Sequence, residues 1–249
     1  MNQRVVLRFS DVSFRYRRSG PWVVQGFSWD VGPGLNLVLG PNGSGKSTLF
    51  GLAAGWLKPK HGSVGPVAAA GASDIRVALV PQRSSAIRGF TVREQAQYVA
   101  WLGGVPSKQL HANAESALAL VGLEAHASER ASDLSGGQLH RLSMAGGLAT
   151  QPDLIILDEP TAGLDLAARQ AAVGLLQQLA STTLAVIASS HVADGLAEVA
   201  DHVAVLREGE LCWSSGIAEF RSLATRPPRG DSWVAAALEA ALHRPESHP

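Results

Sequence analysis

The sequence predicts an α/β fold built on a mostly parallel sheet, and two observations support this prediction. First, a glycine-rich segment at 40–45 lies between a predicted strand and a predicted helix. Second, in the last hundred residues short apolar runs alternate with helical stretches, as is typical of parallel strands joined by crossover helices. The predicted strands of this half lie at 154–157, 184–188 and 203–206, and the helices at 135–149, 166–179 and 192–199.

The first half of the chain predicts further strands and one long helical region. β-Branched and aromatic residues favour strands, and short apolar runs bounded by turn residues mark their limits. The helical region places Val92, Gln95, Ala96, Val99 and Leu102 on one face. The predicted strands lie at 5–9, 12–16, 26–31, 35–39, 62–67 and 75–80, and the helical stretches at 46–56, 91–122 and 232–242.

Composition limits the classes of function. A chain of 249 residues and 26.0 kDa can bury close to three quarters of its unfolded surface and needs no disulfide or metal for stability. Its 21 basic and 21 acidic residues give a net charge of zero, which argues against a broad basic face for nucleic acid. The single cysteine, Cys212, excludes a disulfide framework and a cysteine zinc site.

One stretch without formal charge, 170–193, is long enough to span a bilayer. Its middle, however, contains Gln177, Gln178 and Thr182, where a spanning helix would be most apolar. We therefore expect a helix, a polar turn and a buried strand. The N-terminus has charges where a signal peptide needs an apolar core, so we expect a soluble intracellular protein.

The segment GPNGSGKS at 40–47 has the spacing of a phosphate-binding loop. Its small residues let successive backbone N–H groups turn toward phosphates, and the following helix presents its N-terminus to them. Lys46 would reach the β- and γ-phosphates, and the Ser47 hydroxyl would ligate Mg²⁺. The alternative is an ordinary glycine turn before a helix, but the flanking strand and helix favour the phosphate site.

The segment LIILDE at 154–159 is an apolar strand that ends in two carboxylates. Such a strand is useful where a cation must be held beside phosphates. Asp158 would hold Mg²⁺ through water, and Glu159 would orient and deprotonate an attacking water. The alternative, a strand capped by solvated acids, is disfavoured by the glycine loop in the same chain.

The segment LSGGQ at 134–138 would begin a helix with exposed N–H groups, which form a second anion site. Ser135 could equally act as the N-cap of that helix, and both roles are compatible. Together with the two motifs above, this segment resembles the signature of the ATP-binding cassette (ABC) ATPases. The resemblance covers nearly the whole chain and implies the hydrolysis of ATP with Mg²⁺.

The resemblance also implies roles for individual residues. Gln82 corresponds to the glutamine that contacts Mg²⁺ and water, and His191 to the histidine that contacts the γ-phosphate and supports Glu159. Tyr16 corresponds to the aromatic residue that stacks on adenine. The metal would contact Ser47, Gln82 and Asp158, and the nucleotide would contact Gly40, Pro41, Asn42, Gly43, Ser44, Gly45, Lys46, Ser47 and Thr48.

In this family the signature of one subunit completes the nucleotide pocket of another. The resemblance therefore implies a head-to-tail pair of cassettes, either two copies of this chain or a heterodimer. The residues involved would be Ser135, Gly136, Gly137 and Gln138. The segment AGLD at 162–165 resembles a loop of subunit contact, and Asp165 is also placed to cap the next helix.

Independently of the family, the glycine loop, Gln82, the Asp158–Glu159 pair and His191 each follow a predicted strand. Ligands bind at the carboxyl edge of open α/β sheets, so four motifs on one edge favour a functional site there. The Arg cluster at 15–18 is interpreted as a solvated turn. Two glycines in the signature helix, Gly146 and Gly147, depart from the family pattern and are expected to loosen that helix.

The resemblance implies a P-loop NTPase core with a mostly parallel sheet, an N-terminal antiparallel β-subdomain and an inserted α-helical subdomain. We expect an ABC ATPase domain at 1–225, with the helical subdomain at about 84–134, and a short helical extension at 226–249. This chain has no predicted membrane span of its own, so the resemblance implies an integral-membrane permease as partner and a position on the inner face of the cell membrane.

Three kinds of cassette protein are compatible with the motifs: an exporter subunit, an importer subunit and a soluble cassette protein. The soluble classes need two cassettes or a long coiled-coil arm, and neither is present, so we expect no nucleic-acid partner. The stretch 89–106 resembles small bacterial exporter ATPases of the multidrug and peptide-antibiotic type, and the end of the chain is short. Both observations favour export; the substrate cannot be read from the sequence.

Overall fold

A computed structural model describes residues 6–67, 75–190, 195–224 and 232–243 of the chain. Its strands form one three-stranded and one six-stranded sheet. The strands are β1 (Leu7–Phe14), β2 (Val24–Val31), β3 (Gly34–Leu39), β4 (His61–Pro66), β5 (Val77–Val80), β6 (Leu154–Leu157), β7 (Ala185–Ser190), β8 (His202–Arg207) and β9 (Glu210–Gly216).

Helices connect most of these strands. The α-helices are α1 (Lys46–Ala53), α2 (Val92–Leu102), α3 (Ser107–Leu120), α4 (Gly136–Ala149), α5 (Leu166–Ala180), α6 (Leu196–Val199), α7 (Ile217–Ser222) and α8 (Trp233–Leu242), with short 3₁₀ turns at Glu124–His126 and Ala131–Asp133. The α/β class predicted from the sequence is therefore confirmed. Helix α7 was not expected, and α1 ends three residues earlier than predicted, before the left-handed Gly55.

The six-stranded sheet has the order β5-β6-β7-β3-β8-β9, and all neighbouring strands are parallel except β8 and β9. The registers align the carboxyl ends of the central strands. Leu39 of β3 lies opposite Ser190 of β7, and Leu157 of β6 lies opposite Ala188 of β7 and Val80 of β5. The loops that follow these strands therefore leave the sheet from one edge.

Alternating residues of the central strands bury the two faces of this sheet in two different cores, as the period of two in a strand requires. On β6, Ile155 and Leu157 pack with α2, α4 and α5, whereas Leu154 and Ile156 pack with α1 and the three-stranded sheet. Both faces are covered, so β3 and β6 are apolar over most of their length.

The three-stranded antiparallel sheet has the order β2-β1-β4. The sequence predicted two strands, at 5–9 and 12–16, and this prediction was wrong: β1 is one strand with a bulge. Asp11 has a φ of 48° at the point where the register shifts, and its N–H donates to Ser28 Oγ at 3.0 Å. A residue in this conformation interrupts the alternation without ending the strand, which explains the misleading pattern.

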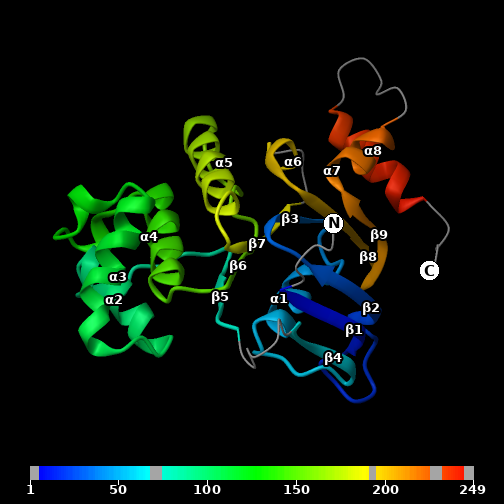
Figure 1. The fold of residues 1–249 in the computed structure, drawn as a ribbon, viewed down its shortest axis with the longest axis horizontal. Coiled ribbons are helices and arrows are strands. Elements are labelled where there is room, and N and C mark those ends of the chain that lie inside the picture. The colour runs from blue at the N-terminus through cyan, green and yellow to red at the C-terminus, as the bar shows by residue number, and fades with distance from the viewer. Residues whose placement is uncertain (1–5, 68–74, 191–194, 225–231, 244–249) are drawn as a thin grey trace.

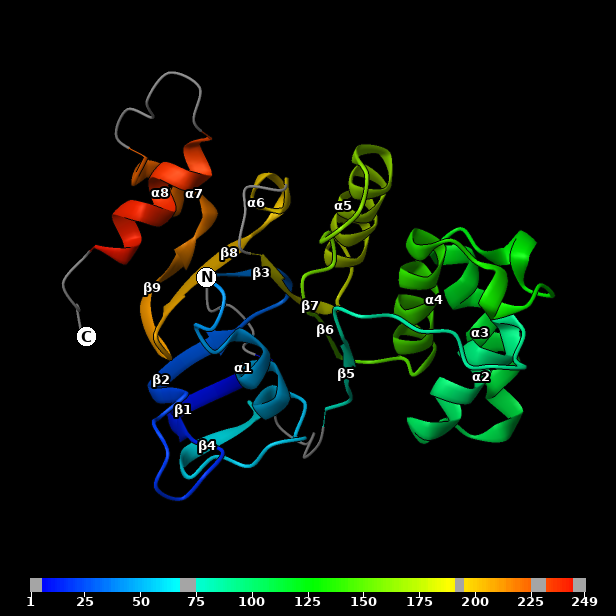
Figure 2. The same cartoon turned by 180° about the vertical axis from the view of Figure 1, so that it is seen from behind.

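The helices α2, α3 and α4 pack against one another and form a layer at one end of the molecule. The three-stranded sheet and helices α7 and α8 lie at the other end, beside strands β8 and β9 of the six-stranded sheet, whose strands β5, β6 and β7 lie nearer the helical layer (Figures 1 and 2). A turn at 103–106 separates α2 from α3. Val92, Gln95 and Ala96 are buried as expected, but Leu102, assigned to the same apolar face, is 63% exposed.

Gly146 and Gly147 of α4 allow close packing and do not interrupt the helix, which runs unbroken from Gly136 to Ala149. A Cβ atom at Gly146 would lie 3.1 Å from Val99 of α2, and one at Gly147 would lie 3.2 Å from Val80 of β5. The cost of glycine in a helix is therefore offset in part by the close approach of α4 to two neighbours.

Within the uncharged stretch at 170–193, residues 170–190 form most of α5, a turn and the buried strand β7, as predicted. Within the described ranges, no helix combines the length and the hydrophobicity needed to cross a bilayer. At the C-terminal side, α8 packs on β8, β9 and α7, and its Val234, Ala237 and Ala241 are buried in the core.

Replacing Gly146 by leucine tests the packing of α4. The side chain would overlap Val99, and overpacking of this kind should lower the free energy of unfolding by about 1–3 kcal/mol. The matched control is Gly174→Leu on α5, where a Cβ atom would meet open space. Chemical denaturation should show a stable control and a destabilised Gly146→Leu. Equal stability of both variants would contradict the packing role.

Candidate functional site

The glycine loop follows β3, which is buried along its whole length, and leads directly into α1. Gly45 lies at the N-terminus of α1 with a φ of 104°, and a Cβ atom there would lie 2.7 Å from the carbonyl oxygen of Val23. Only glycine tolerates both the left-handed backbone and the close approach. The glycine loop therefore packs closely against Val23 where it enters α1, and the N-terminus of a helix favours anions.

Lys46 is the first residue of α1 and is almost completely buried. Its Nζ donates to the carbonyl oxygens of Gly40 at 2.8 Å and Pro41 at 3.0 Å. Burial lowers the pKa of Lys46, and the negative charges of Glu159 and Asp158 oppose that shift. The ammonium group is thus held inside the loop, next to two carboxylates, where phosphate oxygens could replace the carbonyl partners.

Asp158 connects three segments of the sheet edge. Its Oδ2 accepts from Ser47 Oγ at 2.7 Å, and its Oδ1 accepts from Ser189 Oγ at 2.8 Å. Ser189 Oγ also accepts from the backbone N–H of Glu159 at 2.8 Å. The ends of β6 and β7 and the start of α1 are therefore tied together through one carboxylate and one hydroxyl.

Glu159 has a φ of 51°, a left-handed conformation that is uncommon for a residue with a side chain. Gln82, in the loop after β5, donates from Nε2 to Glu159 Oε2 at 2.7 Å. The backbone strain and the side-chain hydrogen bond together fix this carboxylate beside the glycine loop. Glu159 is thus positioned for chemistry at the sheet edge.

Tyr16 lies at the rim of the same region. Its hydroxyl is 3.1 Å from Thr48 Oγ1, and its ring makes an edge contact with Phe14 at 5.0 Å between centroids. The ring is 64% exposed, so a large part of its surface is free to stack on a planar ligand.

The residues of the loop and the two neighbouring strand ends enclose a pocket of about 370 Å³. The set of oxygen donors in this region, the Ser47 hydroxyl, the Asp158 carboxylate and the Gln82 amide, is the type that Mg²⁺ prefers and therefore fits that ion. Elsewhere in the described residues no group of three or more His, Cys, Asp or Glu side chains is arranged to hold a metal. The pocket is lined by Val23, Asn42, Gly43, Gly45, Lys46, Ser47, Thr48, Gln82 and Glu159.

The signature segment lies in a different place. Ser135 is the N-cap of α4: its Oγ accepts from the N–H of Gln138 at 3.3 Å, and Gln138 Oε1 accepts from the N–H of Ser135 at 2.8 Å. No atom lies within 4 Å of a Cβ placed at Gly136, so this helix start is open. The predicted cap is confirmed, but in a single chain these residues do not line the pocket of the glycine loop.

The signature residues instead face the segment 163–165 across a cleft of about 690 Å³. Asp165 caps α5 as expected, since its Oδ1 accepts from the N–H of Ala168 at 2.8 Å. The two segments that the resemblance assigned to subunit contact therefore share one surface. His191 lies outside the described residues, although it directly follows β7, which ends at the site.

Three residues of the site were missed from the sequence. Val23 lines the pocket from the β1–β2 loop, and Ser189 donates to the Asp158 carboxylate and accepts from the backbone N–H of Glu159. His140 of α4 is buried, with Nδ1 3.4 Å from Ser84 Oγ; burial lowers its pKa, and the carbonyl of Pro160 opposes this. Of these three residues, only Ser189 could have been recognised from the sequence, because it is a polar residue at the end of an apolar strand.

Comparison with known proteins identifies the class. The ABC transporter family model matches residues 24–162, which is more than half of the chain. The chain therefore belongs to the ABC transporter family and is an ATP-binding subunit of an ABC transporter. Members of this family hydrolyse ATP, so the protein is an ATPase.

Curated relatives include proteins named for opposite directions of transport. The energy-coupling factor transporter ATP-binding protein EcfA of Methanocaldococcus jannaschii is 35% identical over 83% of this chain and 77% of that protein. The cobalt import ATP-binding protein CbiO of Rhodobacter capsulatus is 33% identical over 85% and 79%. The Nod factor export ATP-binding protein I of Rhizobium etli is 33% identical over 81% of this chain and 65% of that protein.

The fold is shared with solved cassettes. The structure of cbiO1 from Clostridium perfringens, part of the ABC transporter complex cbiONQ, has a TM-score of 0.75 at 25% sequence identity. The superposition covers 91% of this chain and 97% of that one. The P-loop core, the antiparallel sheet and the helical layer expected from the sequence are thus the architecture of an ABC ATPase.

Proposed function

We propose that this chain binds ATP on the loop at 40–48 and hydrolyses it with Glu159 as general base to power transport through a separate membrane subunit. The observation that carries this proposal is the convergence of Lys46, Asp158 and Glu159 at one sheet edge. A buried ammonium group beside an open helix N-terminus favours a ligand with several negative charges. Tyr16 would stack on the adenine, because its exposed ring is tied to Thr48 of the loop.

Glu159 would accept a proton from the attacking water. Its carboxylate is oriented by the 2.7 Å hydrogen bond from Gln82, and its backbone is held by Ser189. A base that is fixed in this way needs little reorganisation when the proton moves. Lys46 would leave the carbonyls of Gly40 and Pro41 for the β- and γ-phosphates and so balance their charge. His191, as the family resemblance implies, would support Glu159.

Ser47, Gln82 and Asp158 would hold Mg²⁺, which supplies positive charge next to the phosphates when it is bound. Asp158 is restrained by Ser189 on one side and by Ser47 on the other. These two hydrogen bonds hold the Asp158 carboxylate near the loop.

The signature residues Ser135, Gly136, Gly137 and Gln138 would complete the pocket of a second cassette. This role is supported by the open start of α4 and by its distance from the loop of its own chain. In two chains arranged head to tail, each nucleotide would contact the glycine loop of one chain and the signature residues of the other. The partner cassette is either a second copy of this chain or a different cassette.

An integral-membrane permease would supply the path for the substrate, and the chain would act on the cytoplasmic face of the membrane. We retain the division into an ATPase domain at 1–225, with a helical subdomain at about 84–134, and an extension at 226–249. The packing of α8 on β8 and β9 indicates that the extension stabilises the end of the sheet.

Export is the proposed direction, on the basis of the resemblance of 89–106 to exporter ATPases and the similarity to a Nod factor export protein. Import is the second candidate, because a cobalt import protein is equally similar in sequence.

Glu159→Gln tests the catalytic assignment. The amide keeps the shape of the side chain but cannot accept a proton, so hydrolysis should fall by about 10²-fold or more while ATP binding survives. Loss of the negative charge beside the γ-phosphate should also favour an ATP-dependent dimer. Turnover assays and light scattering with and without ATP measure both effects. Undiminished hydrolysis would remove Glu159 from the catalytic role.

The added change Ser135→Arg places a large cation at the open start of α4. In the Glu159→Gln chain it should prevent the ATP-dependent dimer but leave nucleotide binding to the monomer within about twofold, because Ser135 does not line the loop pocket of its own chain. Persistence of the dimer would show that the signature does not cover the partner's nucleotide.

Transport direction is tested in inverted membrane vesicles that contain the chain and its permease. An exporter should accumulate substrate inside the vesicles only with ATP on the outside, and Glu159→Gln should abolish the accumulation. ATP-dependent loss of preloaded substrate from inverted vesicles would instead establish import.

A further inference from the structure

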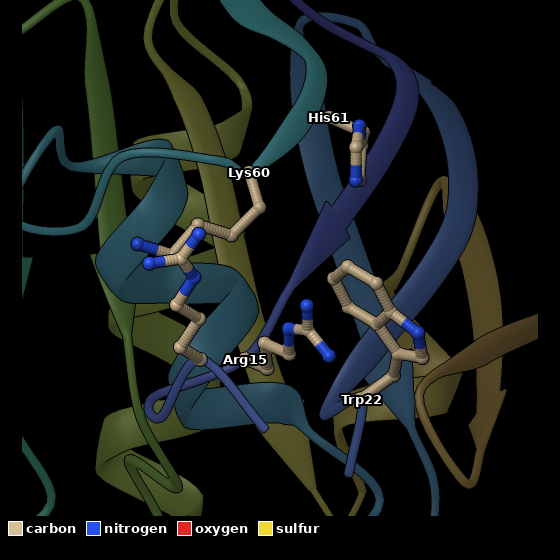
Figure 3. A pocket seen from close by; sticks show the side chains of 5 residues that line it. Arg15, Trp22, Lys60 and His61 are labelled. Atoms are coloured by element: carbon tan, nitrogen blue, oxygen red, sulfur yellow. The ribbon is translucent and has the colours of Figure 1, made fainter. Parts of the chain in front are cut away.

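A second cavity lies beside the three-stranded sheet, and it shares no lining residue with the pocket of the glycine loop. It encloses about 330 Å³ and is lined by five residues: Arg15, Arg18, Trp22, Lys60 and His61. The first three belong to the β1–β2 loop, and the other two lie at the start of β4. In Figure 3, Lys60 and His61 lie on one side of the cavity, and Arg15 and Trp22 lie on the other.

The charged side chains that line this cavity are all of one sign. Arg15, Arg18 and Lys60 are cationic, and none of the five lining residues is acidic. Within the described part of the chain none of the three cations forms an ion pair, and Asp30, a carboxylate of the same sheet, is bound by Arg8 at 2.6 Å. Like charges that face one cavity repel, so a bound anion would stabilise this arrangement.

The cavity is built on ordered backbone. The N–H of Val23 donates to the carbonyl of Phe14 at 2.9 Å, and the N–H of Lys60 donates to the carbonyl of Ser13 at 2.8 Å. The N–H of Gly20 donates to the carbonyl of Arg17 at 3.0 Å and closes the turn that carries Arg18. The two walls of the cavity are therefore fixed to the same strand, β1.

The side chains of Arg15, Trp22 and His61 are also positioned, through contacts with one another. The guanidinium carbon of Arg15 lies 4.4 Å from the centre of the Trp22 ring, and the His61 ring lies 5.5 Å from Trp22 on a tilt of 58°. Arg15 is half-buried, whereas Arg17 and Arg18 are exposed, in agreement with the solvated turn predicted at 15–18. A stacked guanidinium keeps its N–H groups free for a ligand and loses little freedom when it binds one.

We propose that this cavity is a binding site for a phosphate group with at least two negative charges, distinct from the nucleotide site. Two guanidinium groups and an ammonium match the oxygens of such a group, since arginine binds phosphate through paired N–H donors. The volume is that of a site for a small ligand or a lipid headgroup. The ligand is thus a phosphorylated small molecule or the headgroup of an anionic lipid.

The test uses inorganic pyrophosphate as probe, in calorimetric titrations of the full chain without Mg²⁺. The background is Lys46→Ala, which removes the cation of the glycine loop. In this background one pyrophosphate should still bind. Arg18→Gln and Lys60→Gln should each weaken that binding by about tenfold or more, and Arg18→Lys should recover part of it.

The matched control is Lys58→Gln, which removes an exposed charge two residues before Lys60 that does not line the cavity. Its affinity for pyrophosphate should stay within about twofold of the parent. The proposal is overturned if the parent does not bind, if Arg18→Gln and Lys60→Gln bind as well as the parent, or if Lys58→Gln loses as much. Thermal unfolding of each variant shows that it is folded.

Failure of the proposed nucleotide site would give a different result in these titrations. If the glycine loop did not bind phosphates, Lys46→Ala would leave the titration of the wild-type chain unchanged. Vesicles of phosphatidylcholine with phosphatidic acid separate the two sources of ligand. Sedimentation with these vesicles that depends on Arg18 and Lys60 supports a lipid headgroup, and pyrophosphate binding without sedimentation supports a soluble phosphorylated ligand.

Discussion

The parallel register of β5, β6, β7 and β3 is the constraint on which the rest of the site depends. Because Val80, Leu157, Ser190 and Leu39 end their strands at one edge, the loops that follow them meet there. Asp158 joins these loops through hydrogen bonds to Ser47 and Ser189. A shift of one residue in β6 would exchange its two faces and withdraw this carboxylate from the loop.

The sequence predicted the parts of the site that are local. The glycine loop, the acidic pair after β6 and the N-caps at Ser135 and Asp165 depend on residues that are close together in the chain, so their spacing alone indicates their structure. The carboxyl-edge argument then placed Gln82 with Glu159, since every parallel strand ends on the same side. The hydrogen bond between these two side chains agrees with that prediction.

The parts that could not be predicted depend on contacts between distant segments. Nothing near Gly146 in the sequence indicates that Val99 lies against it, and nothing near Arg15 indicates that Lys60 and His61 complete a cavity. The bulge at Asp11 was missed because one left-handed residue interrupts an alternation that otherwise reads as two strands. Ser189 and His140 act through partners that only the sheet edge brings together.

Asp158→Asn tests the central claim most directly, because the amide keeps the shape of the side chain and removes the charge that joins the loops and would hold Mg²⁺. The measurement is the rate of ATP hydrolysis as a function of Mg²⁺ concentration, with thermal unfolding as a check of the fold. We expect a folded chain whose rate falls by about 10²-fold or more at saturating ATP and whose half-maximal rate requires a higher Mg²⁺ concentration. Wild-type turnover with the wild-type Mg²⁺ dependence would contradict the account.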